Sequence, residues 1–142
     1  MMAACMNETA GYSETPLARK LGIKAGIRVV SISAPDDYEQ LLAPIPEGAF
    51  ITNRLERTES FIHLFVTTRA KLEKEFPRLV NRLEASGSLW VSWPKKSSGI
   101  AADVDENVVR EVGLRSGMVD VKVCAVDHIW SGLKFVRRLR DR

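Results

Sequence analysis

The amino-acid sequence predicts a single α/β domain, in which a mostly parallel sheet is flanked by helices and ends in an antiparallel strand hairpin. The chain has 142 residues, a length that fits one domain with one sizeable core. Short β-branched runs alternate with segments of helical periodicity, a pattern typical of βαβ units with right-handed crossovers. The last two strand patterns are separated by so short a turn that they should pair as a hairpin.

The first half of the chain begins with a short helix. Thr15 is a suitable N-cap, Pro16 fits the first helical position and Gly22 fits the stop. The run at 27–32 is nearly all apolar, as expected for a central strand that is buried on both faces. We therefore expect a helix at 15–21, a strand at 27–32, a helix from 35 to 42 and a strand at 49–55.

The next strand, at 61–66, follows very closely after 49–55. The intervening residues 56–60 span at most about 17 Å when extended, whereas a helical crossover between parallel strands takes a dozen or more residues. Either these two strands form an antiparallel hairpin, or the strand at 49–55 is short and the chain returns in an extended conformation.

The second half repeats the strand and helix pattern. Leu72, Phe76, Leu79, Val80 and Leu83 recur at helical spacing; Pro77 predicts a kink or a restart, and Ser86-Gly87 a stop. Asp103 and Glu106 stand at the capping-box interval before a helix that ends at Gly117. The remaining expected elements are a strand at 88–93, a loop at 94–99, a period-two strand at 118–127 and a strand at 130–138.

Composition and charge point to an ordinary globular chain of the cytoplasm. The sequence is 45% hydrophobic and 27% charged, its net charge is +3, and no apolar run approaches the length of a membrane span or a secretory signal. Cys5 and Cys124 belong to no Cys/His cluster, which argues against a disulfide framework and a metal site. We expect residues 1–10 to be a flexible segment, 11–138 the domain and 139–142 a basic tail.

Three segments resemble an uncharacterised bacterial domain-of-unknown-function family: GYSETPLARKLGI (11–23), LWVSWPKK (89–96) and VDVKVCAVDHIWSGLKFV (119–136). That resemblance brings no assigned chemistry. The segment LGIKAGIRVVSI (21–32) and the terminal hairpin are more loosely similar to the small Rossmann-like fold of the S-adenosylmethionine-dependent methyltransferases. This second resemblance implies S-adenosylmethionine as cofactor and a βα unit between the strands at 49–55 and 61–66, for which the chain has no room.

The first turn after the strand at 27–32 departs from the methyltransferase pattern. Such proteins place glycines there, since the backbone approaches the cofactor closely, yet residues 31–36 contain no glycine. Pro35 also fixes its own φ and biases Ala34 towards an extended conformation. The residues themselves therefore predict no cofactor, and they leave the chain's being an enzyme doubtful.

Ligands of open α/β sheets bind outside the carboxyl ends of the parallel strands. Lysines and hydroxyls that follow the strand at 88–93 could hold an anion, and Trp130 could close a pocket there. His63, within an apolar strand, is expected to be a neutral structural histidine, and Trp90 and Trp93 should face opposite sides of the sheet. The candidate ligand-binding residues are Ser33, Asp36, Thr67, Ser92, Lys95, Lys96, Ser97, Ser98 and Trp130.

Three functions follow from these observations. The main hypothesis is a non-catalytic or weakly catalytic module that binds a small anionic ligand or a protein partner at the strand ends. A divergent methyltransferase is the first alternative. Nucleic-acid binding through the basic C-terminus is the second and weaker one, because charged ends mostly serve solubility; that segment is expected to be an edge strand and a frayed tail. The basic residues concerned are Lys134, Arg137, Arg138, Arg140 and Arg142.

Overall fold

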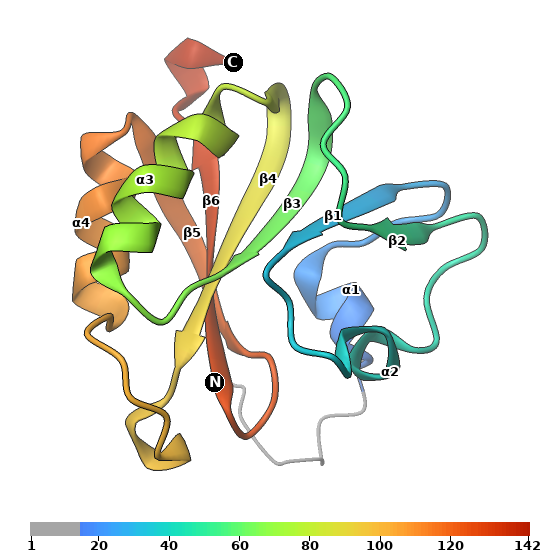
Figure 1. Cartoon of the computed structure of the whole chain (residues 1–142). Helices are drawn as coiled ribbons and strands as arrows, with labels where there is room; N and C mark the ends of the chain where they lie inside the picture. The colour runs from blue at the N-terminus through green and yellow to red at the C-terminus, as the bar shows by residue number, and fades with distance from the viewer. Residues whose placement is uncertain (1–14) are drawn as a thin grey trace.

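The computed structural model describes residues 15–142, which form a six-stranded mixed sheet with helices on both faces (Figure 1). The predicted α/β fold is confirmed. The predicted flexible segment 1–10 and Cys5 lie outside the described residues. The elements are α1 (Leu17–Leu21), β1 (Arg28–Ile32), α2 (Tyr38–Leu42), β2 (Phe50–Thr52), β3 (Glu59–Phe65), α3 (Arg69–Val80), β4 (Leu83–Pro94), the 3-10 turn η1 (Lys96–Ser98), α4 (Glu106–Arg115), β5 (Met118–Ala125), β6 (Trp130–Arg137) and the 3-10 turn η2 (Leu139–Asp141).

The strands lie in the order β2-β1-β3-β4-β6-β5. Strands β2, β1, β3 and β4 pair in parallel, and β6 pairs antiparallel with both β4 and β5. The predicted terminal hairpin is therefore confirmed. The expectation that the C-terminal strand forms a sheet edge is wrong, because β6 inserts between β4 and β5 and leaves β5 at the edge.

The short connection between β2 and β3 replaces a helical crossover. Both strands run parallel to β1, on opposite sides of it, and β2 has only 3 residues, so the chain returns in an extended path through residues 53–58. Arg28 of β1 holds this path: its Nε donates to buried Glu59 at 3.2 Å and its Nη2 donates to the carbonyl of Arg54 at 2.5 Å. The second of the two predicted alternatives is confirmed.

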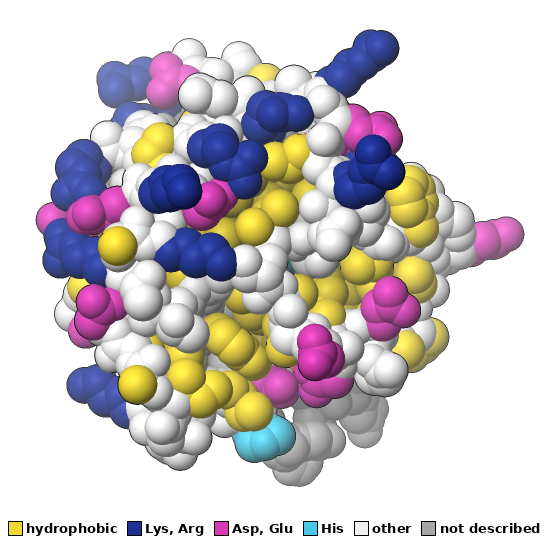
Figure 2. Space-filling view, in the orientation of Figure 1, with side chains coloured by type: hydrophobic (Ala, Val, Ile, Leu, Met, Phe, Trp, Pro, Cys, Tyr) yellow, Lys and Arg dark blue, Asp and Glu magenta, His cyan; other side chains and the backbone are white. Residues whose placement is uncertain are grey.

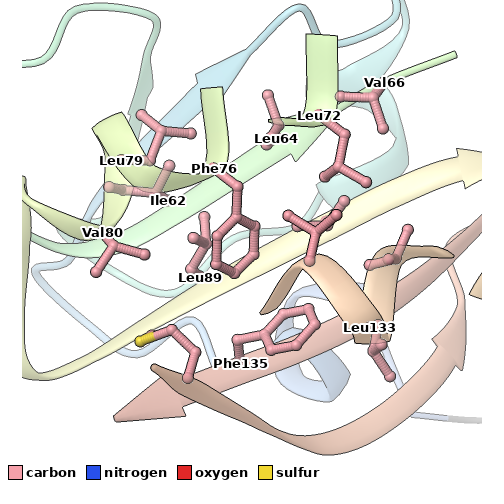
Figure 3. Packing of buried hydrophobic residues seen from close by; sticks show 14 of the residues in the cluster. Ile62, Leu64, Val66, Leu72, Phe76, Leu79, Val80, Leu89, Leu133 and Phe135 are labelled. Atoms are coloured by element: carbon pink, nitrogen blue, oxygen red, sulfur yellow. The ribbon is translucent and has the colours of Figure 1, made fainter. Parts of the chain in front are cut away.

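Two hydrophobic clusters occupy the two faces of the sheet. Val30, Leu64 and Val91 pack under α3 and α4, whereas their strand neighbours Val29 and Phe65 pack against α1 and α2. Alternate residues of a strand point to opposite faces, so a doubly covered strand is apolar at nearly every position. Figure 3 shows the first cluster, in which the rings of Phe76 and Phe135 meet edge to face with centroids 5.1 Å apart. Trp90 and Trp93 are buried on opposite faces, as predicted.

The predicted end of the long helix is wrong. Helix α3 runs through Pro77 to Val80, and β4 begins at Leu83. Gly87 therefore lies within a strand, where a Cβ atom would stand 2.9 Å from the Leu83 side chain and 3.1 Å from the Glu59 carbonyl. A glycine permits this close approach of two strands near the register shift of β3, and it is not a helix stop.

The predicted cap of the next helix is displaced by two residues. Asp105 is the N-cap of α4, and its side chain accepts a hydrogen bond from the Val108 amide. Asp103 instead accepts from the Arg69 amide at 2.6 Å, and its own amide donates to the Thr67 carbonyl. Asp103 thus ties the loop before α4 to the start of α3, a tertiary role that local spacing does not reveal.

Strand β5 has an irregular register between Asp120 and Lys122. Its alternation predicted a strand correctly, but the valines are not its buried side: Val121 and Val123 are 54% and 51% exposed, whereas Met118 and Cys124 are buried. A bulge leaves an extra residue out of the pairing and turns the following side chains to the other face.

Within residues 15–142, no helix is long and apolar enough to cross a bilayer. The same residues contain no group of three or more His, Cys, Asp or Glu placed to hold a metal ion.

Candidate functional site

The turn after β1 adopts a left-handed backbone without glycine. Ser33 has a φ of 61°, a conformation that serine reaches at some energetic cost. Pro35 and Asp36 follow, and α2 begins at Tyr38. The turn after β1 thus reaches a left-handed backbone at a serine and not at a glycine.

A pocket of about 570 Å³ lies beside this turn. It opens at the carboxyl ends of β1 and β2 and is walled by α2; Figure 2 shows Asp and Glu side chains gathered around α2, while most Lys and Arg side chains cover the upper half of the same face. Its floor mixes hydroxyl, amide and carboxylate groups with apolar side chains. The lining residues are Ser31, Ala34, Pro35, Asp36, Tyr38, Glu39, Gln40, Ile51, Thr52 and Asn53.

A buried chain of polar side chains anchors the wall of the pocket. The Tyr38 hydroxyl lies 2.8 Å from Nδ1 of His63, and Nε2 of His63 lies 2.7 Å from Oγ of Ser92. Both ring nitrogens of His63 therefore have partners, and the imidazole also stacks on Phe65. Burial lowers the pKa of His63 to about 3 and raises the pKa of the Tyr38 phenol above its ordinary value. His63 is thus a neutral structural histidine, as predicted.

His63 and Ser92 have the spacing of a general base and a nucleophile, but they do not form a catalytic pair. Both residues are 0% exposed, so no substrate reaches the Ser92 hydroxyl. A histidine whose pKa lies near 3 is also a weak proton acceptor at neutral pH. The arrangement fixes Tyr38, and with it the start of α2, against the sheet.

The predicted ligand-binding residues fall into separate places. Asp36 lines the pocket, and Ser33 lies in the turn beside it, where its Oγ accepts a hydrogen bond from the Lys71 ammonium. Thr67 follows β3, and its carbonyl accepts from the Asp103 amide. Ser92 lies inside the sheet with His63. Trp130 is half-buried and packs edge to face on Phe65, with ring centroids 5.1 Å apart, and it does not line the pocket.

Two polar side chains of the loop after β4 are hydrogen-bonded to backbone carbonyls of the protein. The Lys95 ammonium donates to the Asp127 carbonyl at 2.8 Å, and the Ser98 hydroxyl donates to the Lys95 carbonyl at 2.7 Å. Lys96 and Ser97 are exposed in η1. An anion site in this loop stays a prediction, with only Lys96 and Ser97 left to face a ligand freely.

The basic C-terminus is partly structural. Arg137 donates to the carbonyls of Val80 and Leu83, and so fastens β6 to the turn between α3 and β4. Lys134 is half-buried, and desolvation together with the nearby Lys122 and Lys24 lowers its pKa. Nucleic-acid binding by this segment stays a prediction that rests mainly on the exposed Arg140 and Arg142.

Sequence reasoning missed most of the pocket wall, above all Tyr38, Thr52 and Asn53. A signal existed: in doubly wound sheets the residue that binds a ribose lies at the end of the second strand, about 20 residues after the first turn. Thr52 and Asn53 occupy that place once β2 is known to run parallel to β1.

No family model matches this chain, and no curated protein matches it. Among solved structures, it is similar to a SAM-dependent methyltransferase from Aquifex aeolicus, with a TM-score of 0.60 and 13% identity over 84% of this chain and 86% of that one. It is also similar to the magnesium protoporphyrin IX methyltransferase of Synechocystis PCC 6803, solved with bound SAM, with a TM-score of 0.55 and 11% identity over 86% of this chain and 74% of that one. The chain therefore has an α/β methyltransferase-like fold.

Proposed function

We propose that this chain is a divergent methyltransferase-fold protein that binds an S-adenosylmethionine-type ligand in the pocket beside α2. The observation that carries the proposal is the place of the pocket, at the carboxyl ends of β1 and β2. The strand order reverses beside the pocket: the chain places β2 on one side of β1 and then β3 on the other side. Open α/β sheets bind nucleotides at such a switch point.

The lining suits a nucleoside. A volume of about 570 Å³ lies within the range of small-molecule pockets. Asn53 and Thr52, at the end of β2, offer amide and hydroxyl groups to ribose hydroxyls, and Ile51 and Ala34 offer apolar surface to a base. The methyltransferase of Synechocystis, which shares the fold, was solved with SAM bound.

Binding is the whole of this proposal. The proposed site lies at the carboxyl ends of the strands, as the sequence predicted, but at the turns after β1 and β2 and not in the loop after β4.

Isothermal titration calorimetry with S-adenosylmethionine and with its demethylated product tests the proposal. We expect both ligands to give saturable heat with the wild-type chain. Ala34→Phe, which fills the pocket from the β1 turn, should abolish that heat, and Asn53→Ala should weaken binding about fivefold, the equivalent of one hydrogen bond.

Ala101→Phe is the matched control, since it makes the same change at an exposed loop position outside the pocket, and it should bind like the wild type. Absence of heat from the wild-type chain with both ligands would refute the proposal. Unchanged binding by a folded Ala34→Phe variant would place the site elsewhere.

A further inference from the structure

Lys71 joins the two sides of the switch point. It lies in the first turn of α3, which follows β3, and its ammonium donates a hydrogen bond to Oγ of Ser33, which follows β1. Strands β1 and β3 are adjacent and parallel, with Ile32 opposite Leu64. The contact therefore spans the carboxyl ends of the two strands between which the strand order reverses.

The Lys71 ammonium has no acidic partner among the described residues. Among residues 15–142, none places a carboxylate within ion-pair distance of it, whereas Arg69 and Arg78 of the same helix pair with Glu73 and Glu75. An ammonium has three donors, and Ser33 takes one. The side chain is half-buried, so its position is more restricted than that of a surface lysine.

The contact adjoins the pocket. Ser31 and Ala34 line it, and Ser33 lies between them in the chain with its left-handed backbone. In doubly wound sheets the ribose binds at the end of the second strand, and the charged substituent of the nucleoside lies against the first strand-to-helix turn. In this chain the turn has no glycines to bring several amides to an anion, and the Lys71 ammonium stands there instead.

We propose that Lys71, with Ser33, binds an anionic group on the 5′ substituent of the nucleoside, a role that rests on the proposed function. The group is either the carboxylate of an amino-acid tail or a phosphate. Asp36 and Glu39, which line the pocket, favour the amino-acid tail, because a zwitterion offers an ammonium to these carboxylates as well as a carboxylate to Lys71.

Paired ligands test this assignment in calorimetric titrations. S-adenosylhomocysteine and 5′-methylthioadenosine share the nucleoside and the thioether, but only the first has the amino-acid tail, with its carboxylate and its ammonium. AMP and adenosine form the second pair and differ by the phosphate. We expect the carboxylate to tighten binding to the wild-type chain about tenfold, a gain that shrinks as salt is raised.

Titrations of Lys71 variants with the same ligands test whether this side chain causes the gain. Lys71→Met keeps the length of the side chain and should remove the part of the gain that the carboxylate supplies, so that the difference between S-adenosylhomocysteine and methylthioadenosine shrinks. Lys71→Arg should restore part of it. Lys74→Met is the control, since this exposed lysine lies on the same helix away from Ser33. A thermal melt of each variant checks folding.

Each outcome decides a separate claim. A gain within either ligand pair that falls in Lys71→Met and not in Lys74→Met supports the assignment, and the pair concerned identifies carboxylate or phosphate. If the nucleosides bind but neither pair differs, or the difference is undiminished in Lys71→Met, the role of Lys71 is refuted and the proposed function stands. If no nucleoside binds, the proposed function fails and this inference with it.

Discussion

The two halves of the sheet are built differently. On one side, β3, β4 and β6 have 7, 12 and 8 residues, and the helices that follow β3 and β4 in the chain, α3 and α4, have 12 and 10 residues. On the other side, β1 and β2 have 5 and 3 residues, and the helices before and after β1, α1 and α2, have 5 residues each. The pocket and the left-handed turn both lie in the lighter half. We expect the heavier half to supply most of the stability. The lighter half, where a full strand and helix unit would not fit between β2 and β3, contains the candidate pocket.

Removal of the same phenyl group from each half should have very different effects. Phe76→Ala empties a fully buried position against Phe135 and should lower the free energy of unfolding by about 3–5 kcal/mol. Phe50→Ala, on β2, removes a ring that is 48% exposed and should cost about 1 kcal/mol or less, including its contact with Arg28. Urea denaturation measures both. Equal losses would contradict the division between a stabilising half and a site-bearing half.

Acid should lower the free energy of unfolding through His63, which lies on β3 opposite Ser31 of β1. Burial lowers the pKa of His63 in the folded chain to about 3, against about 6.5 when unfolded, so the unfolded state binds the proton more readily. The stabilisation is present above pH 6.5 and is lost as the pH falls towards 3. Between pH 7 and pH 5 we expect the free energy of unfolding to drop by about 2 kcal/mol.

Denaturation curves at a series of pH values measure this loss. His63→Gln should flatten the dependence between pH 7 and pH 5, whatever its own cost in stability. His128→Gln alters the exposed histidine of the β5–β6 turn and should leave the dependence unchanged. A pH dependence that persists in His63→Gln would assign it to other groups.

The smallest expected effect is the release of strain at the site. Ser33→Gly should raise the free energy of unfolding by up to about 1 kcal/mol, because glycine adopts a φ of 61° without a Cβ clash and loses only part of the gain to chain entropy. Gly99→Ser is the reverse change at a turn with a φ of 79° and open surroundings, and it should destabilise by a similar amount. Thermal melts compare them. A destabilised Ser33→Gly variant would show that the Lys71 hydrogen bond outweighs the strain.

Sequence patterns predicted the heavier half better than the lighter one. The apolar strand at 61–66, the buried neutral His63 and the opposed Trp90 and Trp93 all follow from local periodicity and were found. The stop at Gly87 and the cap at Asp103 were wrong, since both residues serve contacts with distant strands and helices. Such tertiary roles override a local signal.

The residues that line the candidate pocket were predicted only in part. Asp36 and the β1 turn were selected by the rule for strand ends, whereas Thr52 and Asn53 were not, because the direction of the strand at 49–55 stayed open. Parallel pairing of a 3-residue strand depends on partners in β1, and nothing in its own composition specifies that direction. Lys71 was missed for the same reason: its partner Ser33 is 38 positions away.

The two edge strands of the sheet also affect whether folded copies of the chain aggregate. An open sheet edge can recruit another strand, and long flat edges are the most hazardous. One edge strand is β2, which is too short to form more than a few backbone hydrogen bonds with a strand of another copy. The other is β5, whose bulge interrupts its register and whose Lys122 lies next to the exposed Val121 and Val123. Both edges are therefore poor templates for fibrillar growth, and aggregation of this protein should require unfolding of the sheet first.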